Sequence, residues 1–324
     1  MTILRCIAAM LSVVLLAVLP AAAADNWPSR PIQMVSPFSA GNANDIVARV
    51  VLDQVGRQIG QSFVIENRPG AGGSVGASSV AKAEPDGYTV LLYSSSIASQ
   101  MVIHKTLSYD PVGDFLPVIL FGIQPSVLVV SPSKGWKTVA DLIAAAKAKP
   151  GALNFASAGL GSASHLAGER LRLAAKIDVQ HIPFRGPVEA FTELMSGRID
   201  YYFLPIAPAL PNIKNGKLVA LAVSTPKRTT LLPDVPTIVE AGYPDAQYLF
   251  WGGIALPAKT PRAIALKLHD EVQKALDQPA IRERLTTLGV QPMPMSVDEY
   301  GKFVRDDVAS TIALARAIKL EPSN

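Results

Sequence analysis

Cysteine is almost absent from this sequence of 324 residues. The single cysteine, Cys6, comes before an apolar run over residues 7–19. A lipid-modified cysteine would instead follow such a run, at the point of cleavage. Removal of this N-terminal segment would leave a chain without thiols, which excludes disulfides, thiolate metal sites, iron–sulfur clusters and cysteine nucleophiles. The stability of that chain must therefore come from its hydrophobic core, and 49% of the residues are hydrophobic.

The sequence also has no apolar segment long enough to cross a bilayer. The run over residues 7–19 is shorter than the roughly 20 residues that a membrane-spanning helix needs. Arg5 precedes the run, and Ala22 and Ala24 follow it, which is the pattern of a secretory signal peptide. A transit peptide would instead carry several arginines and serines. We therefore predict that residues 1–24 are a signal peptide and that the mature chain is exported.

Clusters of like charge are lacking as well. The 30 basic and 26 acidic residues give a formal net charge of +4, and no run of lysines or arginines occurs. This distribution argues against nucleic acid as a partner. The small positive excess suits an anionic ligand, although ordinary solubility explains it equally well.

Motifs of nucleotide-binding and metal-dependent enzymes are missing. The chain has no phosphate-binding loop, dinucleotide-binding fingerprint or G-x-S-x-G nucleophile elbow. Its four histidines, His104, His165, His181 and His269, lack the spacing of metal ligands. The sequence therefore predicts no cofactor and no metal. A serine hydrolase that uses Ser162 and His165 stays open, although a histidine at a helix start more often orients the turn.

Strand and helix signals alternate along the chain, which predicts an α/β fold with parallel sheets covered by helices. A mature chain of about 300 residues favours two domains. Short apolar runs predict strands, and apolar residues at helical spacing predict helices. The predicted strands cover residues 32–37, 63–65, 88–93, 153–156 and 199–203, and the predicted helices cover 46–59, 138–146, 187–197, 261–276, 280–288 and 296–318.

One turn pattern occurs twice. Ser39-Ala40-Gly41 follows a predicted strand and precedes a helix, and Ser157-Ala158-Gly159 does the same later in the chain. Each is followed, after a similar interval, by an arginine beside a Gly-Pro or Pro-Gly pair, at residues 68–70 and 185–187. Any two βαβ units share Gly-rich turns, so this similarity has an ordinary explanation. The functional interpretation is that two lobes each present a helix N-terminus to one cleft.

Ligands of parallel α/β sheets bind where strands end and helices begin, and free backbone N–H groups there favour anions. We therefore predict ligand contacts in both turns, with Asp45 as a helix cap rather than a contact. The predicted contacts of the first turn are Phe38, Ser39, Ala40, Gly41, Asn42 and Asn44, and those of the second are Gly161, Ser162, Ser164 and His165. Ser94 and Ser95, after a third strand, and Arg185 and Gly186, before a helix, complete the polar candidates.

Several longer motifs carry a resemblance to a known family. They are Trp27-Pro28-Ser29-Arg30-Pro31-Ile32, Pro37-Phe38-x-Ala40-Gly41, Glu66-Asn67-Arg68-Pro69-Gly70-Ala71-Gly72-Gly73, Pro85-Asp86-Gly87-Tyr88-Thr89, Tyr109-Asp110-Pro111, Ser164-His165-Leu166-Ala167-Gly168-Glu169 and Leu232-Pro233-Asp234-Val235-Pro236-Thr237. In this order, the motifs resemble the Bug receptors, which are the substrate-binding subunits of tripartite tricarboxylate transporters. The resemblance covers the whole mature chain.

The resemblance implies a periplasmic-binding-protein-like (type II) clamshell, or Venus flytrap, of two α/β lobes. Residues 25–127 and 250–324 would form the first lobe and residues 128–249 the second. Crossover strands near residues 125–130 and 248–254 would form the hinge. The chain would be a periplasmic receptor that catalyses no reaction. Its partners would be a small carboxylate and the membrane permease subunits, and it would act as a monomer.

Two departures from the family pattern bear on the ligand. Asn42 stands where the family often has a second glycine, and it adds a hydrogen-bond donor. Leu204 and Pro205 stand where the family commonly has an aspartate after a strand, so we include both among the predicted contacts and expect an apolar ligand body. The sequence thus predicts a mono- or dicarboxylate with an aliphatic or aromatic body rather than an amino acid. A periplasmic sensor that acts on a sensor kinase remains an alternative to transport.

Overall fold

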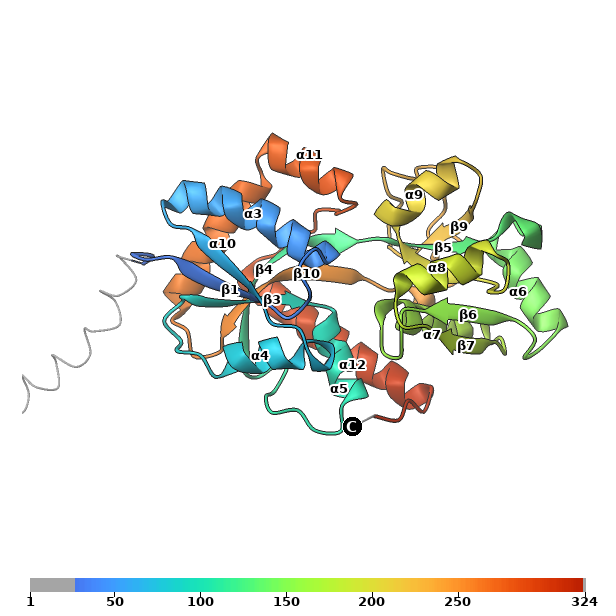
Figure 1. Cartoon of the computed structure of the whole chain (residues 1–324), viewed down its shortest axis with the longest axis horizontal. Coiled ribbons are helices and arrows are strands. Elements are labelled where there is room, and N and C mark those ends of the chain that lie inside the picture. The colour runs from blue at the N-terminus through green and yellow to red at the C-terminus, as the bar shows by residue number, and fades with distance from the viewer. Residues whose placement is uncertain (1–26, 323–324) are drawn as a thin grey trace, which may run out of the picture.

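The computed structural model describes residues 27–322, so the predicted signal peptide lies outside the described residues. Figure 1 shows two lobes side by side, joined by extended segments of the chain. Within residues 27–322, no helix combines the length and the apolarity that a membrane span requires. The fold is therefore the predicted α/β clamshell.

The first lobe is built around a five-stranded sheet with the order β2-β1-β3-β10-β4. Strands β1, β2 and β3 run parallel, whereas β10 runs antiparallel to both of its neighbours. The elements of this lobe are β1 (Ile32–Ser36), α3 (Ala43–Ile59), β2 (Phe63–Asn67), η1 (Ala71–Gly73), α4 (Ser74–Ala81), β3 (Thr89–Ser94), α5 (Ser96–Ile103), β4 (Phe115–Gln124), β10 (Phe250–Pro257), α10 (Arg262–Leu276), α11 (Pro279–Thr287) and α12 (Val297–Ala317).

The second lobe contains a three-stranded sheet with the order β8-β5-β9, whose pairs are antiparallel, and the parallel pair β6-β7. Its elements are β5 (Ser126–Val130), η2 (Pro132–Lys134), α6 (Val139–Ala148), β6 (Asn154–Ser157), α7 (Ala163–Ala175), β7 (Gln180–Pro183), α8 (Pro187–Met195), β8 (Tyr202–Pro205), α9 (Ile206–Lys214), β9 (Val219–Val223) and η3 (Pro244–Ala246).

Three sequence-based expectations need correction. The first-lobe sheet is mixed and the three-stranded sheet of the second lobe is antiparallel, whereas parallel sheets were expected. In the first lobe the reason is that β4 and β10 run in opposite directions as the chain crosses between the lobes. The strand expected over residues 199–203 is β8, which starts at Tyr202, since Asp200 and Tyr201 instead bond to β6. The crossing near residue 125 is also not one continuous strand, because Pro125 separates β4 from β5.

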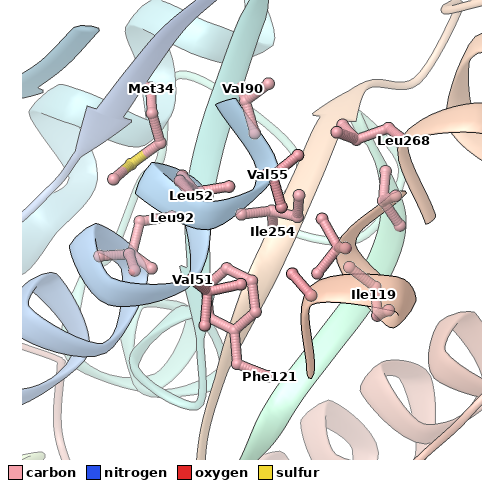
Figure 2. Packing of buried hydrophobic residues seen from close by; sticks show 14 of the residues in the cluster. Met34, Val51, Leu52, Val55, Val90, Leu92, Ile119, Phe121, Ile254 and Leu268 are labelled. Atoms are coloured by element: carbon pink, nitrogen blue, oxygen red, sulfur yellow. The ribbon is translucent and has the colours of Figure 1, made fainter. Parts of the chain in front are cut away.

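Successive side chains of each strand point to opposite faces of the first-lobe sheet, and apolar side chains cover both faces. Met34, Val90 and Leu92 point to the core under α3 and α10, and their neighbours Leu91 and Tyr93 point to the core under α5 and α12. Figure 2 shows the first of these cores, in which side chains of α3 and α10 pack on the strands. Burial of such side chains contributes roughly 1.5–3 kcal/mol each, which makes the sheet a rigid platform for the turns at its edge.

The crossover strand β10 needs a glycine at its centre. A Cβ atom on Gly253 would lie 2.3 Å from the carbonyl oxygen of Ile119 and 2.7 Å from the hydroxyl of Tyr300. Gly253→Ala should therefore lower the free energy of unfolding by about 2 kcal/mol through overpacking. Chemical denaturation followed by tryptophan fluorescence measures this change, because Trp251 lies in the same strand.

Gly301→Ala is the matched control. Gly301 lies inside α12, and the nearest atom to its added Cβ would be the Arg305 guanidinium at 3.5 Å. Alanine there should raise the free energy of unfolding by roughly 0.5–1 kcal/mol, because it stiffens the unfolded chain. Equal midpoints for wild type and Gly253→Ala would contradict the close approach of these strands.

Candidate ligand-binding site

The first candidate turn connects β1 to α3. The Asn42 side chain caps α3, because its Oδ1 accepts a hydrogen bond of 3.0 Å from the amide of Asn44. The Asp45 carboxylate folds back and accepts a hydrogen bond of 3.0 Å from the amide of Gly41. Gly41 adopts a φ of 82°, a conformation that favours glycine. These bonds fix the direction in which the turn enters the helix.

The Asp45 carboxylate is buried, and three groups compensate its charge. Arg49 donates from Nε at 2.9 Å and Asn67 from Nδ2 at 2.9 Å, in addition to the Gly41 amide. Burial alone would raise the pKa of Asp45, but the hydrogen bonds from Arg49, Gly41 and Asn67 outweigh it and hold the pKa below 3.8. Asp45 is therefore an ionised structural residue that closes the turn, and the helix cap predicted at Asp45 is provided by Asn42 instead.

The second candidate turn connects β6 to α7. Ser162 caps α7, because its Oγ accepts a hydrogen bond of 3.3 Å from the amide of His165. The His165 ring folds back, and its Nδ1 accepts a hydrogen bond of 3.0 Å from the amide of Gly161. Gly161 adopts a φ of 73°. Each feature of the first turn thus has a counterpart here.

The equivalence of the two turns extends to their backbone bonds. The amide of Asn42 bonds to Ser39 O at 3.2 Å, and the amide of Ser162 bonds to Gly159 O at 3.1 Å. Gly41 therefore corresponds to Gly161. The sequence-based alignment of Gly41 with Gly159 is wrong by two residues, because the cap and not the Ser-Ala-Gly triplet defines the geometry.

Both turns keep backbone amides without an internal partner. In the part of the chain that the structure describes, no acceptor is found for the amides of Ala40 and Ala43 in the first turn. The same holds for the equivalent amides of Leu160 and Ala163 in the second turn. Unpaired amides at a helix N-terminus, together with the helix dipole, attract anions.

A pocket of about 180 Å³ lies between the lobes. The first lobe contributes α5 along its length, the second lobe contributes the second candidate turn, and the crossover segment contributes two aromatic rings. Its lining residues are Ser95, Ser96, Ser99, Gln100, Ile103, Leu160, Gly161, Ser162, Ala163, Tyr248 and Phe250. The lobes meet closely here, because a Cβ atom on Gly161 would lie 2.3 Å from the side chain of Ile103.

A second, more open depression of about 480 Å³ lies over the first turn. Five predicted contacts line it together with parts of the loop that follows β2. The lining residues are Pro37, Phe38, Ser39, Ala40, Gly41, Asn42, Pro69, Gly70 and Gly73. The predicted contacts therefore fall into two groups, one in this depression and one, consisting of Ser95, Gly161 and Ser162, in the pocket between the lobes.

The other predicted contacts lie outside the linings of these two cavities. Asn44 is buried, and its Oδ1 accepts a hydrogen bond of 2.9 Å from Gln124 at the end of β4. Ser94 is buried beneath α5, and the Ser164 hydroxyl accepts from the Ala158 amide at 3.0 Å. These side chains shape the turns from behind. His165 is also turned inward, since only 3% of its side chain is exposed.

The remaining candidates belong to the second lobe. Leu204 is buried in its core, because β8 extends to Pro205, beyond the expected end, and Leu204 pairs with Val127. Pro205 precedes α9 and is half-buried, Arg185 is exposed, and Gly186 precedes α8. Sequence reasoning did not identify Ile103, Gln100 and the aromatic pair Tyr248 and Phe250 as pocket residues; only the aromatic pair had a signal, its place in the predicted crossing.

The geometry of Ser162 and His165 does not match an activated serine. The Ser162 hydroxyl bonds to the backbone amide of His165 and lies 3.2 Å from the hydroxyl of Ser164. The ring Nδ1 of His165 is already engaged by the Gly161 amide. A nucleophilic serine needs a base within hydrogen-bond reach of its hydroxyl, and this ring nitrogen does not serve as one.

Comparison with known proteins identifies a family and solved structures that are similar to this chain. Residues 47–320 match the model of the tripartite tricarboxylate transporter family receptor. Protein BugT of Bordetella pertussis is 34% identical over 295 residues, which cover 90% of each chain. Among solved structures, R. palustris Rpa4515 with adipate has a TM-score of 0.79 and 32% identity, and it covers 92% of this chain and 100% of that chain.

A further solved structure is MatC from Rhodopseudomonas palustris with bound malate, with a TM-score of 0.74 and 33% identity; the match covers 89% of this chain and 99% of that chain. The family model spans most of the sequence, and these relatives share both its length and its fold. The chain is therefore a member of the tripartite tricarboxylate transporter receptor family, to which the Bug proteins belong.

Proposed function

We propose that this protein is a periplasmic receptor that captures a small carboxylate between its two lobes and delivers it to a membrane transporter. The observation that carries this proposal is the pair of equivalent turns, each of which leaves one turn amide, Ala40 or Leu160, and the first helical amide, Ala43 or Ala163, without an acceptor among the described residues. An anion that accepts hydrogen bonds from both turns stabilises the closed arrangement of the lobes. The proposal includes no catalytic step.

The interaction energies fit such a role. Hydrogen bonds to a charged group contribute about 1.5–3 kcal/mol each. Three or four of them, with apolar contacts to Phe250, Tyr248 and Ile103, reach the roughly 8 kcal/mol of micromolar binding after the cost of ordering the ligand. The pocket between the lobes supplies both kinds of contact, because serine hydroxyls lie beside these apolar side chains.

We propose that the ligand is a mono- or dicarboxylate with an aliphatic or aromatic body. Two relatives of solved structure hold ligands of this class, adipate and malate. The lining of the pocket between the lobes contains no acidic side chain that would pair with a ligand ammonium group. This composition supports the preference against amino acids that we inferred from Leu204 and Pro205, although Leu204 itself lies in the core.

The hinge is part of the same proposal. We assign residues 25–127 and 250–324 to the first lobe and 128–249 to the second, with the crossings near Pro125 and Phe250 as hinge segments. The support for this assignment is the division of the hydrophobic clusters, since the buried residues of β4 and β10 belong to the clusters of one lobe and those of β5 and β9 to the clusters of the other. At the border, Phe250 and Leu314 pack against the cluster of the second lobe.

Export and partners follow from the same reasoning. Residues 1–24 would direct the chain to the periplasm, where the closed receptor, as a monomer, would meet the permease subunits. A sensor kinase that recognises the closed lobes remains the alternative output.

Isothermal titration calorimetry of the mature chain tests the ligand class. We expect adipate, malate and an aromatic carboxylate such as benzoate to include at least one ligand of micromolar affinity, and aspartate and glutamate to bind more weakly. Native mass spectrometry of the freshly purified protein should find a co-purified acid of the same class. Tighter binding of the amino acids, or no binding of any carboxylate, would contradict the proposal.

The two helix caps provide a test of the site. Asn42→Ala and Ser162→Ala each remove a cap that fixes a ligand turn, and the loss of such a cap costs about 1 kcal/mol. We expect each variant to bind the best carboxylate about tenfold more weakly, which corresponds to about 1.4 kcal/mol. Titration calorimetry measures the dissociation constants.

Ser296→Ala is the control for this test. Ser296 caps α12 by the same hydrogen bond, from the Glu299 amide to its Oγ, in the first lobe and outside the linings of both cavities. It should lower the free energy of unfolding by a similar amount and leave the dissociation constant unchanged. Unchanged affinity in both turn variants would overturn the assignment of the site.

A further inference from the structure

Two histidine rings lie stacked behind the second candidate turn. The centroids of His165 and His181 are 4.0 Å apart, with an angle of 20° between the ring planes. Phe155 continues the stack below His181 at 4.9 Å, and Tyr201 follows at 5.4 Å from Phe155. A ring stack of this kind restricts both imidazoles to one orientation.

Each ring of the pair reaches a different part of the turn. Nδ1 of His165 accepts the hydrogen bond from the Gly161 amide, so this nitrogen carries no proton and the neutral ring is protonated on Nε2. Nε2 of His181 lies 2.6 Å from the hydroxyl of Ser157. That hydroxyl is also 3.1 Å from both the amide and the carbonyl oxygen of Gly159. The two rings therefore hold the turn on both sides of Leu160.

We propose that the stacked pair His165 and His181 positions the ligand-binding turn of the second lobe, and that it does so only while both rings are neutral. This inference rests on the proposed function of the turn and names the residues that set its affinity. His165 and His181 are positioning residues, because their side chains bond to the turn and lie behind it rather than in the pocket lining.

The first lobe shows why the neutral state matters. The residue equivalent to His165 is Asp45, whose negative charge lies behind the first turn and is compensated by Arg49. The imidazole of His165 accepts the equivalent hydrogen bond, from the Gly161 amide, without carrying a charge. A negative charge at this position would oppose a bound carboxylate, whereas a proton on Nδ1 would face the Gly161 N–H group and break the bond.

The surroundings of the rings keep them neutral. Burial, with smaller contributions from His181 and Arg172, lowers the pKa of His165 to about 3. Burial lowers the pKa of His181 to about 4. The titratable and charged groups around the pair are Glu169 and Arg172 on α7 and Tyr201 beside β8, and Glu169 Oε1 lies 3.9 Å from Nε2 of His165. Both rings are therefore neutral at physiological pH.

Three substitutions of His165 separate its hydrogen bond from its charge. His165→Ala leaves the Gly161 amide without an acceptor, and we expect about tenfold weaker carboxylate binding. His165→Asn places a neutral amide oxygen near the position of Nδ1 and should restore most of the affinity. His165→Asp supplies an acceptor with a negative charge and should bind more weakly than His165→Asn. Titration calorimetry at pH 7 measures all three.

His269→Ala is the matched control. The His269 ring bonds to Asp270 and to the carbonyl oxygen of Met295 in the first lobe, away from both cavities. Its removal should leave the dissociation constant at the wild-type value. Equal affinities of His165→Ala and wild type would overturn the positioning role, and equal affinities of His165→Asp and His165→Asn would overturn the requirement for neutrality.

Acid sensitivity gives a readout that does not depend on the ligand. In the unfolded chain a histidine has its ordinary pKa of 6.5, whereas the folded-state pKa of His165 is about 3. The unfolded state therefore binds more protons between these values, so the free energy of unfolding falls as the pH decreases from 6.5 towards 3. The asparagine of His165→Asn does not bind a proton in this range. The free energy of unfolding of this variant should therefore fall less between pH 6.5 and 4 than that of the wild type. Other titrating groups, such as Asp307, are common to both proteins and cancel in the comparison.

Nitrogen-15 NMR of ligand-free protein, with labelled histidine, completes the test. We expect the Nδ1 signal of His165 to show an unprotonated nitrogen at pH 7 and the Gly161 amide to be protected from hydrogen exchange. A protonated Nδ1 at pH 7, or acid sensitivity identical in wild type and His165→Asn, would overturn the proposal. Because these measurements use no carboxylate, they separate a failure of this inference from a failure of the proposed function.

Discussion

The proposed binding face of each lobe depends on one local interaction, the hydrogen bond from a glycine amide to the side chain four residues later. Gly41 donates to Asp45 and Gly161 donates to His165. Each bond closes the turn before the helix and consumes an amide that would otherwise face outward. Each bond thereby determines which amides remain unpaired. These are the amides of Ala40 and Leu160 in the turns and the amides at the start of each helix. The direction of the proposed carboxylate-binding surface is thus set by the fold of the turns, before a ligand binds.

The two turns share this geometry but differ in electrostatics. A buried carboxylate in the first lobe requires Arg49 and Asn67 as partners, and this ties the turn to β2 and to the surface of α3. The uncharged ring of His165 requires no counter-ion, and a stack of aromatic rings supports it instead. In the proposed site, a ligand between the lobes therefore contacts two turns with different support. A network of charged and polar side chains supports the turn of the first lobe, and a stack of aromatic rings supports the turn of the second lobe.

Local signals in the sequence predicted the helix starts, whereas contacts between distant segments were not predictable. Thr138 and Ser296 cap helices that begin at the predicted starts, because a cap depends on residues three positions apart. The start of β8 was misplaced, since Tyr201 bonds to β6 through tertiary contact that no local pattern reports. The predicted alignment of the two turns, which matched Gly41 with Gly159, was wrong for a similar reason. Side chains at Asp45 and His165 define the equivalence, and these residue types share no sequence signature.

Helix α7 leads from the second candidate turn to a contact with α12 of the first lobe. At its N-terminus, Gly161 packs against Ile103 of the first lobe. About two turns later, Arg170 donates to Ser310 of α12 at 2.9 Å and lies over the ring of Tyr248 at 5.8 Å. The helix thus touches the first lobe at two separated points. If the lobes move about the proposed hinge segments, both contacts of α7 with the first lobe must change together, so a ligand bound at the turn and the Arg170–Ser310 hydrogen bond respond to the same motion.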